Sequence, residues 1–272
     1  MEDEYCIRDK GRFAAVFDGH GGGGVSTYLR QRLYDLIESH LKQSKTTNSS
    51  SSTTHNPSSL EETVSSIRNA FDQIDQEVLN TDALQYQGST AVAVYLHRDD
   101  ATGQQTLISA NVGDSRAILS KSGVAVDLTR DHKPNDKLER KRIMDMGEDI
   151  EWDDYGGVFR VRNLSLSRAI GDRFAKPVVS GDVEIKLFPL KEELVEKKVV
   201  VGDSMSATHD FVLLASDGLW DVMTSQVSQS LSLQCYQLIS TCKPTQFLLL
   251  SLIHVRIVWI LFTNALALPQ YS

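Results

Sequence analysis

The sequence is poor in cysteine and in positive charge. Its three cysteines, Cys6, Cys235 and Cys242, are too few and too scattered for a disulfide framework or a zinc site, so we expect a reducing compartment. Lysine and arginine number 28 against 36 aspartates and glutamates, a formal net charge of −8. Nucleic acids and anionic membranes are bound by clustered cations, so this composition disfavours both as partners. The excess of carboxylates fits metal enzymes, among other classes.

A secretory signal is also missing from the N-terminus. The first residues are acidic and no apolar run follows them, so we expect an intracellular protein, either cytoplasmic or nuclear. A mobile surface insertion is predicted at residues 44–59, where eleven of sixteen residues are serine or threonine and none is strongly apolar. A cluster of phosphorylation sites is the alternative for this segment.

Acidic residues are absent from the last 45 residues, in which only Lys243 and Arg256 carry charge. Residues 247–268 form a largely apolar run of 22 residues, long enough to span a bilayer, although Arg256 opposes insertion by about 2.5–3.5 kcal/mol. Three alternatives stay open: a transmembrane helix that tethers the protein, a buried helix or strand, and a segment foreign to the fold. We favour the third, and treat 228–272 as an atypical hydrophobic tail.

The spacing of apolar residues predicts an α+β domain. Helices are predicted at 25–43, 60–80 and 135–146. Short strands are predicted at 13–17, 90–96, 106–112, 116–121, 124–128, 183–188 and 211–215. Tight turns between the middle strands predict antiparallel pairing, and the lack of a regular strand–helix alternation argues against a doubly wound sheet.

Three aspartates, Asp18, Asp114 and Asp217, each follow an apolar strand and stand beside a glycine. A carboxylate at the end of a buried strand is fixed in place, and the glycine lets backbone carbonyls and water approach the same cation. One Asp-Gly turn is usually structural. Three such turns behind hydrophobic strands predict a site in which oxygen ligands hold a hard cation.

Longer motifs surround these turns in a fixed order along the chain. They lie at residues 1–3, 13–22, 88–91, 111–117, 166–172 and 215–221. Their sequences are MED, FAAVFDGHGG, GSTA, NVGDSRA, LSRAIGD and ASDGLWD. Together they resemble the metal-dependent protein phosphatase 2C family, with Asp131-His132-Lys133-Pro134 fitting an intervening segment. The resemblance covers roughly residues 1–227, which we interpret as a phosphatase 2C-like catalytic domain.

The resemblance implies a fold, a reaction and a class of substrate. The implied fold is an α+β sandwich of two antiparallel β-sheets flanked by α-helices, incomplete at the C-terminus in this chain. The implied reaction is hydrolysis of phosphoserine and phosphothreonine by a hydroxide that bridges two Mn²⁺ or Mg²⁺ ions, with a weaker third ion nearby. Phosphorylated proteins would be the substrates, and we expect a monomer.

The resemblance also implies metal ligands in this sequence. Asp18 takes the place of the carboxylate that bridges both metals, and the carbonyl oxygen of Gly19 is a further ligand. Glu2 and Asp3 match the acidic pair at the start of the family's motif, with Glu2 acting mainly through water. Asp217 would bind the other metal.

The third metal position and the proton donor follow from the same resemblance. Asp114, Asp217 and Asp221 would line the third position. His20 matches the family's candidate for the proton donor to the leaving group, a step that helps an alkoxide to leave. Residues 147–159 match a variable flap that would bias the choice of substrate.

Other polar and aromatic residues in these motifs are interpreted as structural. We expect Arg168 to be an internal ion-pair partner and Trp220 to lie in the core. We expect His132 to be a surface histidine or a histidine with satisfied hydrogen bonds.

The sequence departs from the family pattern at both ends. The family has an arginine a few residues before the Met-Glu-Asp stretch, and this sequence begins at Met1. The family also has an Asp-Asn turn near its end whose Asp is another metal ligand, and no Asp or Glu follows Gln226 here. We therefore expect activity well below that of an intact relative. A non-catalytic pseudophosphatase that binds phosphoproteins is the alternative.

Overall fold

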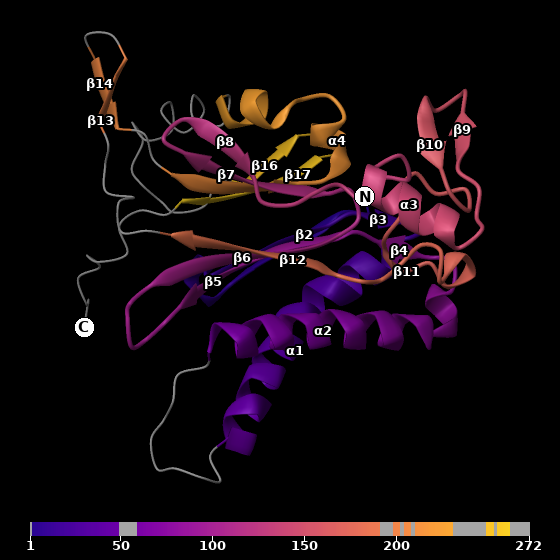
Figure 1. The fold of residues 1–272 in the computed structure, drawn as a ribbon, viewed down its shortest axis with the longest axis horizontal. Coiled ribbons are helices and arrows are strands. Elements are labelled where there is room, and N and C mark those ends of the chain that lie inside the picture. Colours follow the sequence, from indigo (N-terminus) through magenta and orange to yellow (C-terminus); the bar gives the residue numbers. More distant parts are fainter. Residues whose placement is uncertain are drawn as a thin grey trace.

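Two five-stranded antiparallel sheets pack face to face in the computed structural model (Figure 1). The structure describes residues 2–48, 59–190, 198–201, 204–207, 210–230, 249–252 and 255–261. The first sheet has the order β1–β2–β5–β6–β12. Its strands are β1 (Glu4–Arg8), β2 (Phe13–Phe17), β5 (Ala91–Arg98), β6 (Gln105–Val112) and β12 (Glu184–Leu190).

The second sheet has the order β16–β17–β15–β7–β8. Its strands are β7 (Arg116–Lys121), β8 (Val124–Asp127), β15 (Phe211–Ala215), β16 (Leu249–Leu252) and β17 (Val255–Leu261). β15 is therefore a central strand, paired with β7 on one side and with β17 on the other.

Three small sheets complete the strands. Hairpins are formed by β9 (Glu151–Asp153) with β10 (Val158–Arg160), and by β13 (Lys198–Val201) with β14 (Ser204–Ala207). A three-stranded sheet is formed by β3 (Gly19–His20), β4 (Gly88–Ser89) and β11 (Ile170–Gly171), in the order β11–β4–β3.

Two long helices, α1 (Gly24–Asn48) and α2 (Leu60–Leu79), cover the outer face of the first sheet (Figure 1). α2 begins with a capping box, in which the Ser59 side chain accepts from the Glu62 N–H and the Glu62 side chain accepts from the Ser59 N–H. The other α-helices among the described residues are α3 (Lys137–Asp145), α4 (Asp217–Trp220) and a helical segment at 225–230.

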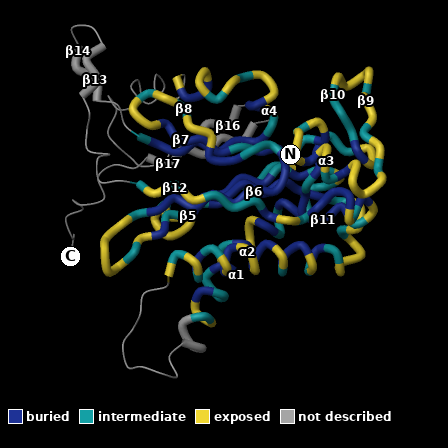
Figure 2. The backbone as a smooth tube through the Cα atoms, viewed as in Figure 1, coloured by how far each residue is buried: buried dark blue, intermediate teal, exposed yellow. Residues whose placement is uncertain are grey.

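The hydrophobic core has two main layers, and strand β2 contributes to both. Phe13, Ala15 and Phe17 pack among the apolar residues of α1 and α2, whereas Ala14 and Val16 pack between the two sheets. This alternation follows from the pleat of a strand, which directs successive side chains to opposite faces. The buried strands form the dark centre of Figure 2.

The predicted α+β sandwich is confirmed, together with all three predicted helices and the seven predicted strands, within a few residues at their ends. The insertion was predicted to start too early, because α1 continues through residue 48. The rest of that segment, residues 49–58, lies outside the described residues.

Part of the predicted tail forms strands. Residues 249–252 and 255–261 are β16 and β17, which pair with each other, and β17 also pairs with β15. No helix within the described part of the chain is both long and apolar enough to cross a membrane. The remainder of 247–268 is not described, and the domain boundary at residue 227 stays a prediction.

Candidate active site

The three predicted acidic turns lie at the same end of the sandwich. Asp18 follows β2, Asp114 follows β6, and Asp217 follows β15 as the first residue of α4. These carboxylates lie close enough to affect one another, because the charges of Asp3, Asp217 and Asp114 all raise the pKa of Asp18. Burial, and then these charges and a hydrogen bond to Asp3, raise the pKa of Asp18 from 3.8 to about 9.

Thr90 connects two of the acidic turns. Its Oγ1 accepts a hydrogen bond from the Asp18 N–H at 3.1 Å and lies 2.7 Å from the Ser115 Oγ. The Thr90 N–H donates to the Asp18 carbonyl oxygen at 2.9 Å. The backbone on either side of the Asp18 carboxylate is thus held by a residue of the GSTA motif that sequence analysis gave no role.

Asp114 is the most deeply buried of these carboxylates, with 2% of its surface exposed. Burial, followed by the charge of Asp217, raises its pKa to about 7, against an opposing effect of Lys133. The preceding Gly113 has φ +107° and would place a Cβ 2.6 Å from the Thr90 side chain, so only glycine fits. The Gly113 N–H donates to His132 Nδ1 at 3.1 Å.

Lys133 supplies a positive charge within the acidic cluster. Its Nζ lies 2.6 Å from the Asp221 carboxylate and 4.0 Å from that of Asp114. Lys133 thus lies beside Asp114 and Asp221, two of the three carboxylates that were predicted to line a third metal position. Burial, followed by the charge of Asp221, raises the pKa of Asp217, the third member of that set.

The first residues of the chain reach the same site. The Ser216 Oγ donates to an Asp3 carboxylate oxygen at 3.1 Å, which joins this segment to the turn before α4. A Cβ on Gly19 would lie 2.6 Å from the Glu2 carbonyl oxygen, so Gly19 allows the two backbones to approach. The Glu2 residue is itself exposed to solvent.

His20 forms a hydrogen bond to a carboxylate that lies outside the acidic cluster. Its Nε2 lies 2.7 Å from Asp172 Oδ2, and the Asp172 side chain has no exposed surface. Burial by itself lowers the pKa of His20, but the hydrogen bond and charge of Asp172, with the charges of Asp114 and Glu2, raise it above 6.5 overall.

The donor chemistry of the cluster fits hard divalent cations. All the side-chain donors are carboxylate oxygens, which Mg²⁺ and Mn²⁺ prefer. Buried carboxylates that raise one another's pKa are stabilised by a cation placed between them. Among the described residues, however, no three His, Cys, Asp or Glu side chains are arranged so that they could hold a metal ion. Cation binding would have to draw these carboxylates together.

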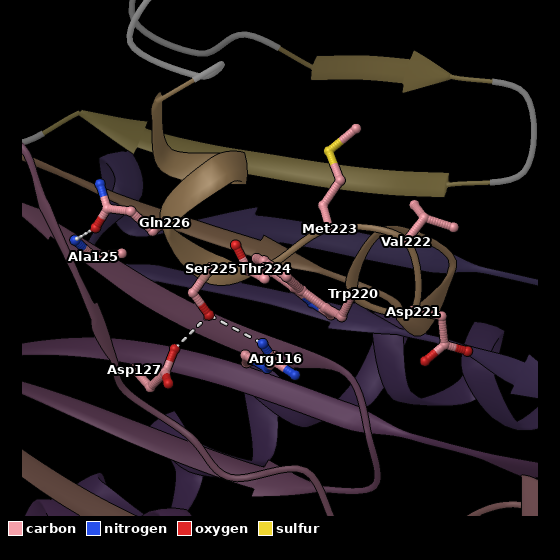
Figure 3. Close-up of a pocket in the computed structure, with 10 residues that line it drawn as sticks. All are labelled: Arg116, Ala125, Asp127, Trp220, Asp221, Val222, Met223, Thr224, Ser225 and Gln226. Atoms are coloured by element: carbon pink, nitrogen blue, oxygen red, sulfur yellow. Dashed lines mark hydrogen bonds between the residues drawn. The ribbon is translucent and has the colours of Figure 1, made fainter.

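A groove of about 560 Å³ lies beside the acidic cluster (Figure 3). It is lined by residues of β7, β8 and the segment 220–226, and Asp221 is the member that it shares with the cluster. The Arg116 guanidinium lies 5.0 Å from the centre of the Trp220 ring and 2.7 Å from the Asp131 carboxylate. Trp220 is 7% exposed, so its predicted place in the core is confirmed.

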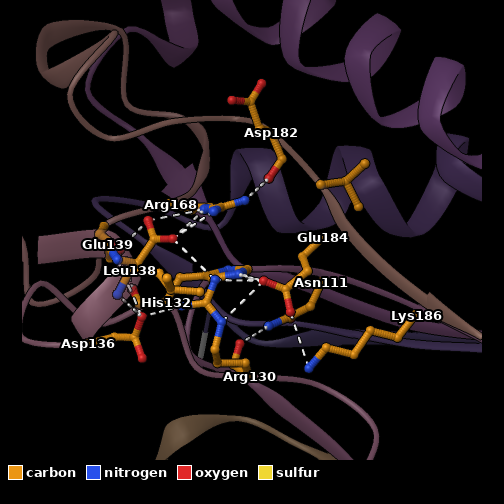
Figure 4. A network of polar contacts seen from close by, with 12 residues as sticks. Asn111, Arg130, His132, Asp136, Leu138, Glu139, Arg168, Asp182, Glu184 and Lys186 are labelled. Carbon is orange, nitrogen blue, oxygen red and sulfur yellow. Dashed lines mark hydrogen bonds and ion pairs between the residues drawn. The ribbon is translucent and has the colours of Figure 1, made fainter. Parts of the chain in front are cut away.

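A network of ion pairs that includes His132 lies around α3 and the start of β12 (Figure 4). Glu139 of α3 is 1% exposed and pairs with Arg168 at 2.6 Å, Arg142 at 3.0 Å and Arg130 at 3.3 Å. The prediction that Arg168 is an internal ion-pair partner is confirmed. His132 is fully buried, and both of its ring nitrogens form hydrogen bonds. It is therefore a histidine with satisfied hydrogen bonds, the second of the two predicted alternatives, and not a surface histidine.

Several residues that form this site carry no signal of their role in the sequence. Thr90, His132, Lys133 and Asp172 stand in the quoted motifs, but none was assigned a role toward the predicted ligands. The distances along the chain explain this, since Asp172 contacts a histidine 152 positions away. Only a three-dimensional arrangement of the motifs identifies such a pair.

Comparison with known proteins identifies the family. The family model described as protein phosphatase 2C matches residues 4–239. The chain is 35% identical over 235 residues to Probable protein phosphatase 2C 59 of Arabidopsis thaliana, covering 83% of this chain and 63% of the relative. It is 38% identical over 213 residues to Probable protein phosphatase 2C 45 of Oryza sativa subsp. japonica, covering 78% of this chain and 61% of the relative.

The fold is shared with solved structures of the same kind. The crystal structure of serine-threonine phosphatase 2C from Toxoplasma gondii superposes with a TM-score of 0.66, at 20% identity, covering 96% of this chain and 90% of that one. The sandwich fold and the match to the family model agree with each other. The chain belongs to the protein phosphatase 2C family, and it spans somewhat more than three fifths of the length of the two plant relatives, 63% and 61%.

Proposed function

We propose that this chain hydrolyses phosphoserine and phosphothreonine on proteins with Mn²⁺ or Mg²⁺ bound by its acidic cluster. The observation that supports this most is the approach of Asp3, Asp114 and Asp217 to Asp18, at the end of the sandwich where His20 also lies. Membership of the family supports the same reaction class.

The cluster would hold the cations through side-chain and backbone oxygens. We assign Asp18 and the Gly19 carbonyl to the centre of the site, with Glu2 and Asp3 on one side and Asp217 on the other. Asp114, Asp217 and Asp221 would form a weaker third position, in which Lys133 already pairs with Asp221. When bound, divalent cations lower the pKa of coordinated water and neutralise charge on the phosphoryl oxygens.

His20 would supply the proton that a serine or threonine leaving group needs. An alkoxide leaves poorly, and a protonated imidazole beside the ester oxygen lowers that barrier. The hydrogen bond that the described structure gives this ring is through Nε2, to Asp172. Nδ1 is therefore the atom that would carry the proton to the leaving oxygen.

Other properties of this function stay predictions. They include a monomeric state, a cytoplasmic or nuclear location, reduced turnover, and an influence of the 147–159 flap on the choice of substrate. Within that flap, β9 and β10 form a hairpin in which Trp152 is 52% exposed.

The test is release of phosphate from a phosphothreonine peptide in the presence and absence of Mn²⁺. We expect release that requires Mn²⁺, that EDTA abolishes, and that Asp18→Asn lowers by at least a hundredfold. Asp145→Asn is the matched control, because Asp145 is an exposed α3 carboxylate paired with Lys141. Release that is independent of Mn²⁺, or unchanged in Asp18→Asn, would contradict the proposed function.

Binding of phosphoproteins without turnover is the second candidate function. The observation that favours it is Lys133, whose Nζ lies 2.6 Å from Asp221 and 4.0 Å from Asp114 and so occupies part of the acidic cluster with a positive charge of the chain itself. A folded chain that binds the phosphothreonine peptide but releases no phosphate with Mn²⁺ would establish it. Fluorescence anisotropy of a labelled peptide measures that binding directly, with the unphosphorylated peptide as the control.

A further inference from the structure

The three-stranded sheet β11–β4–β3 places three motifs of the sequence in contact. His20 of β3 is paired with Gly88 of β4, and Gly88 is paired in turn with Gly171 of β11. Asp172 follows Gly171 directly. The central strand of this small sheet therefore separates the backbone of His20 from that of Asp172, and their side chains meet across it.

Gly88 provides the space for that contact. A Cβ at this position would lie 2.2 Å from Asp172 Oδ2 and 2.5 Å from His20 Nε2, the two atoms that form the hydrogen bond. Real Cβ atoms do not approach other atoms so closely, so any side chain would force the pair apart. Position 88 therefore requires glycine, because the hydrogen bond between His20 and Asp172 takes up the space that a side chain would need.

Asp172 is held rigidly in its place. Its N–H donates to the Gln87 carbonyl oxygen at 3.0 Å, and the N–H of the preceding Gly171 donates to Asp75 of α2 at 2.8 Å. Its backbone has φ +50°, a left-handed conformation that Asp and Asn adopt more readily than most residues. The side chain is fully buried, and within the described residues its Oδ1 has no hydrogen-bond partner.

These contacts leave His20 as the only side chain that the described structure hydrogen-bonds to the Asp172 carboxylate. A buried carboxylate with a single partner costs free energy, so its presence here calls for a functional explanation. Its Oδ2 accepts the Nε2–H of the ring, which fixes the orientation of the imidazole and leaves Nδ1 as the nitrogen that can act on a substrate.

We propose that Asp172 is a positioning residue for His20, and that Gly88 makes this role possible by leaving room for the hydrogen bond. The inference rests on the proposed function, in which His20 is the proton donor. As a water oxygen bonds to phosphorus and the ester P–O bond breaks, the electron pair of that bond goes to the serine or threonine oxygen and the Nδ1 proton passes to it. The ring is left neutral and keeps the Nε2–H that Asp172 accepts.

Leaving groups of different basicity test this role. A phosphothreonine peptide releases an alkoxide and needs the proton, whereas p-nitrophenyl phosphate releases a stable phenolate and hardly needs it. We expect Asp172→Asn and Gly88→Ala to lower kcat on the peptide by about 10²-fold, and kcat on p-nitrophenyl phosphate by less than about threefold. Asn keeps the shape and the left-handed backbone of Asp172 while removing its charge.

Gly23→Ala is the matched glycine control. A Cβ there meets its nearest atom, the Glu2 Cα, at 3.8 Å, an ordinary contact distance, so we expect activity on both substrates to be unchanged. Equal losses on both substrates in the Asp172 and Gly88 variants would overturn the inference, because a general loss of structure does not depend on the leaving group.

A double-mutant cycle with His20→Ala gives a second test. If Asp172 acts through His20, Asp172→Asn has no further effect on peptide turnover once the imidazole is gone. A further loss of tenfold or more in the double variant would overturn the inference.

Nuclear magnetic resonance of ¹⁵N-histidine-labelled protein separates this inference from the proposed function, because it needs no turnover. At alkaline pH, where the ring is neutral, we expect His20 to be the Nε2–H tautomer in the wild type and a mixture of tautomers in Asp172→Asn and Gly88→Ala. An Nδ1–H tautomer in the wild type, or identical spectra in all three, would overturn the inference. A chain that shows the expected tautomers and releases no phosphate would refute the proposed function alone.

Discussion

Replacement of Glu139 by glutamine removes the charge of a deeply buried carboxylate in the network of Figure 4. The carboxylate is 1% exposed and lies within 3.3 Å of three guanidinium groups. Burial by itself raises the pKa of Glu139, but the hydrogen bonds and charge of Arg168, with His132 and Arg142, lower it from 4.5 to about 2.

The size of the effect follows from that shift. A fall in pKa from 4.5 to about 2 corresponds to about 3 kcal/mol of folding free energy. Removing one partner from a buried ion pair independently costs about 3–5 kcal/mol, because the remaining charge stays buried. We therefore expect Glu139→Gln to lower the free energy of unfolding at pH 7 by about 3 kcal/mol.

Urea unfolding over a range of pH is the assay. A group whose pKa is lowered by folding stabilises the protein fully above its unfolded pKa, and that contribution disappears as the pH falls through its folded pKa. The difference between wild type and Glu139→Gln should thus be constant above pH 4.5 and shrink toward about pH 2.

Asp145→Asn is the control on the same helix, because the Asp145–Lys141 pair is more than half exposed. Exposed pairs contribute little, so we expect a loss of less than about 1 kcal/mol. Equal losses in the two variants, or a Glu139→Gln difference that does not shrink in acid, would refute the reasoning.

Three further substitutions address the acidic cluster. Gly19→Ala places a methyl group 2.6 Å from the Glu2 carbonyl oxygen, so Mn²⁺ binding measured by calorimetry should weaken; unchanged affinity would contradict this packing. Thr90→Val leaves the Asp18 N–H without its acceptor, so the free energy of unfolding measured in urea should fall by about 1–3 kcal/mol. A fall of less than about 0.5 kcal/mol would count against that hydrogen bond. Lys133→Met removes a competing charge and should tighten the weakest Mn²⁺ site in a calorimetric titration; weaker or equal binding would be inconsistent with competition.

Much of the fold follows from local sequence patterns. The strands at 13–17 and 211–215 are continuous apolar runs, which predicts strands, and the structure buries both of their faces. The strands of the β11–β4–β3 sheet have two residues each, too few for any periodicity to show. The extension of α1 through residue 48 was missed because a polar run is typical of a loop and does not prevent a helix.

The candidate site was predictable where one residue carries its own signal. An Asp beside Gly at the end of an apolar strand marks Asp18, Asp114 and Asp217 from the sequence alone, and the structure places all three at one end of the sandwich. The contact between His20 and Asp172 has no such signal, because it depends on a missing side chain at Gly88 and on a register between short strands.

Calorimetric titration of the chain with Mn²⁺, beside its Asp18→Asn variant, tests the central claim that the acidic cluster is a divalent-cation site. We expect the wild type to bind at least two Mn²⁺ ions and the variant to lose the tightest of them, while Asp145→Asn binds like the wild type. Indistinguishable titrations of the wild type and Asp18→Asn, or no heat of binding in a folded wild-type chain, would contradict that claim.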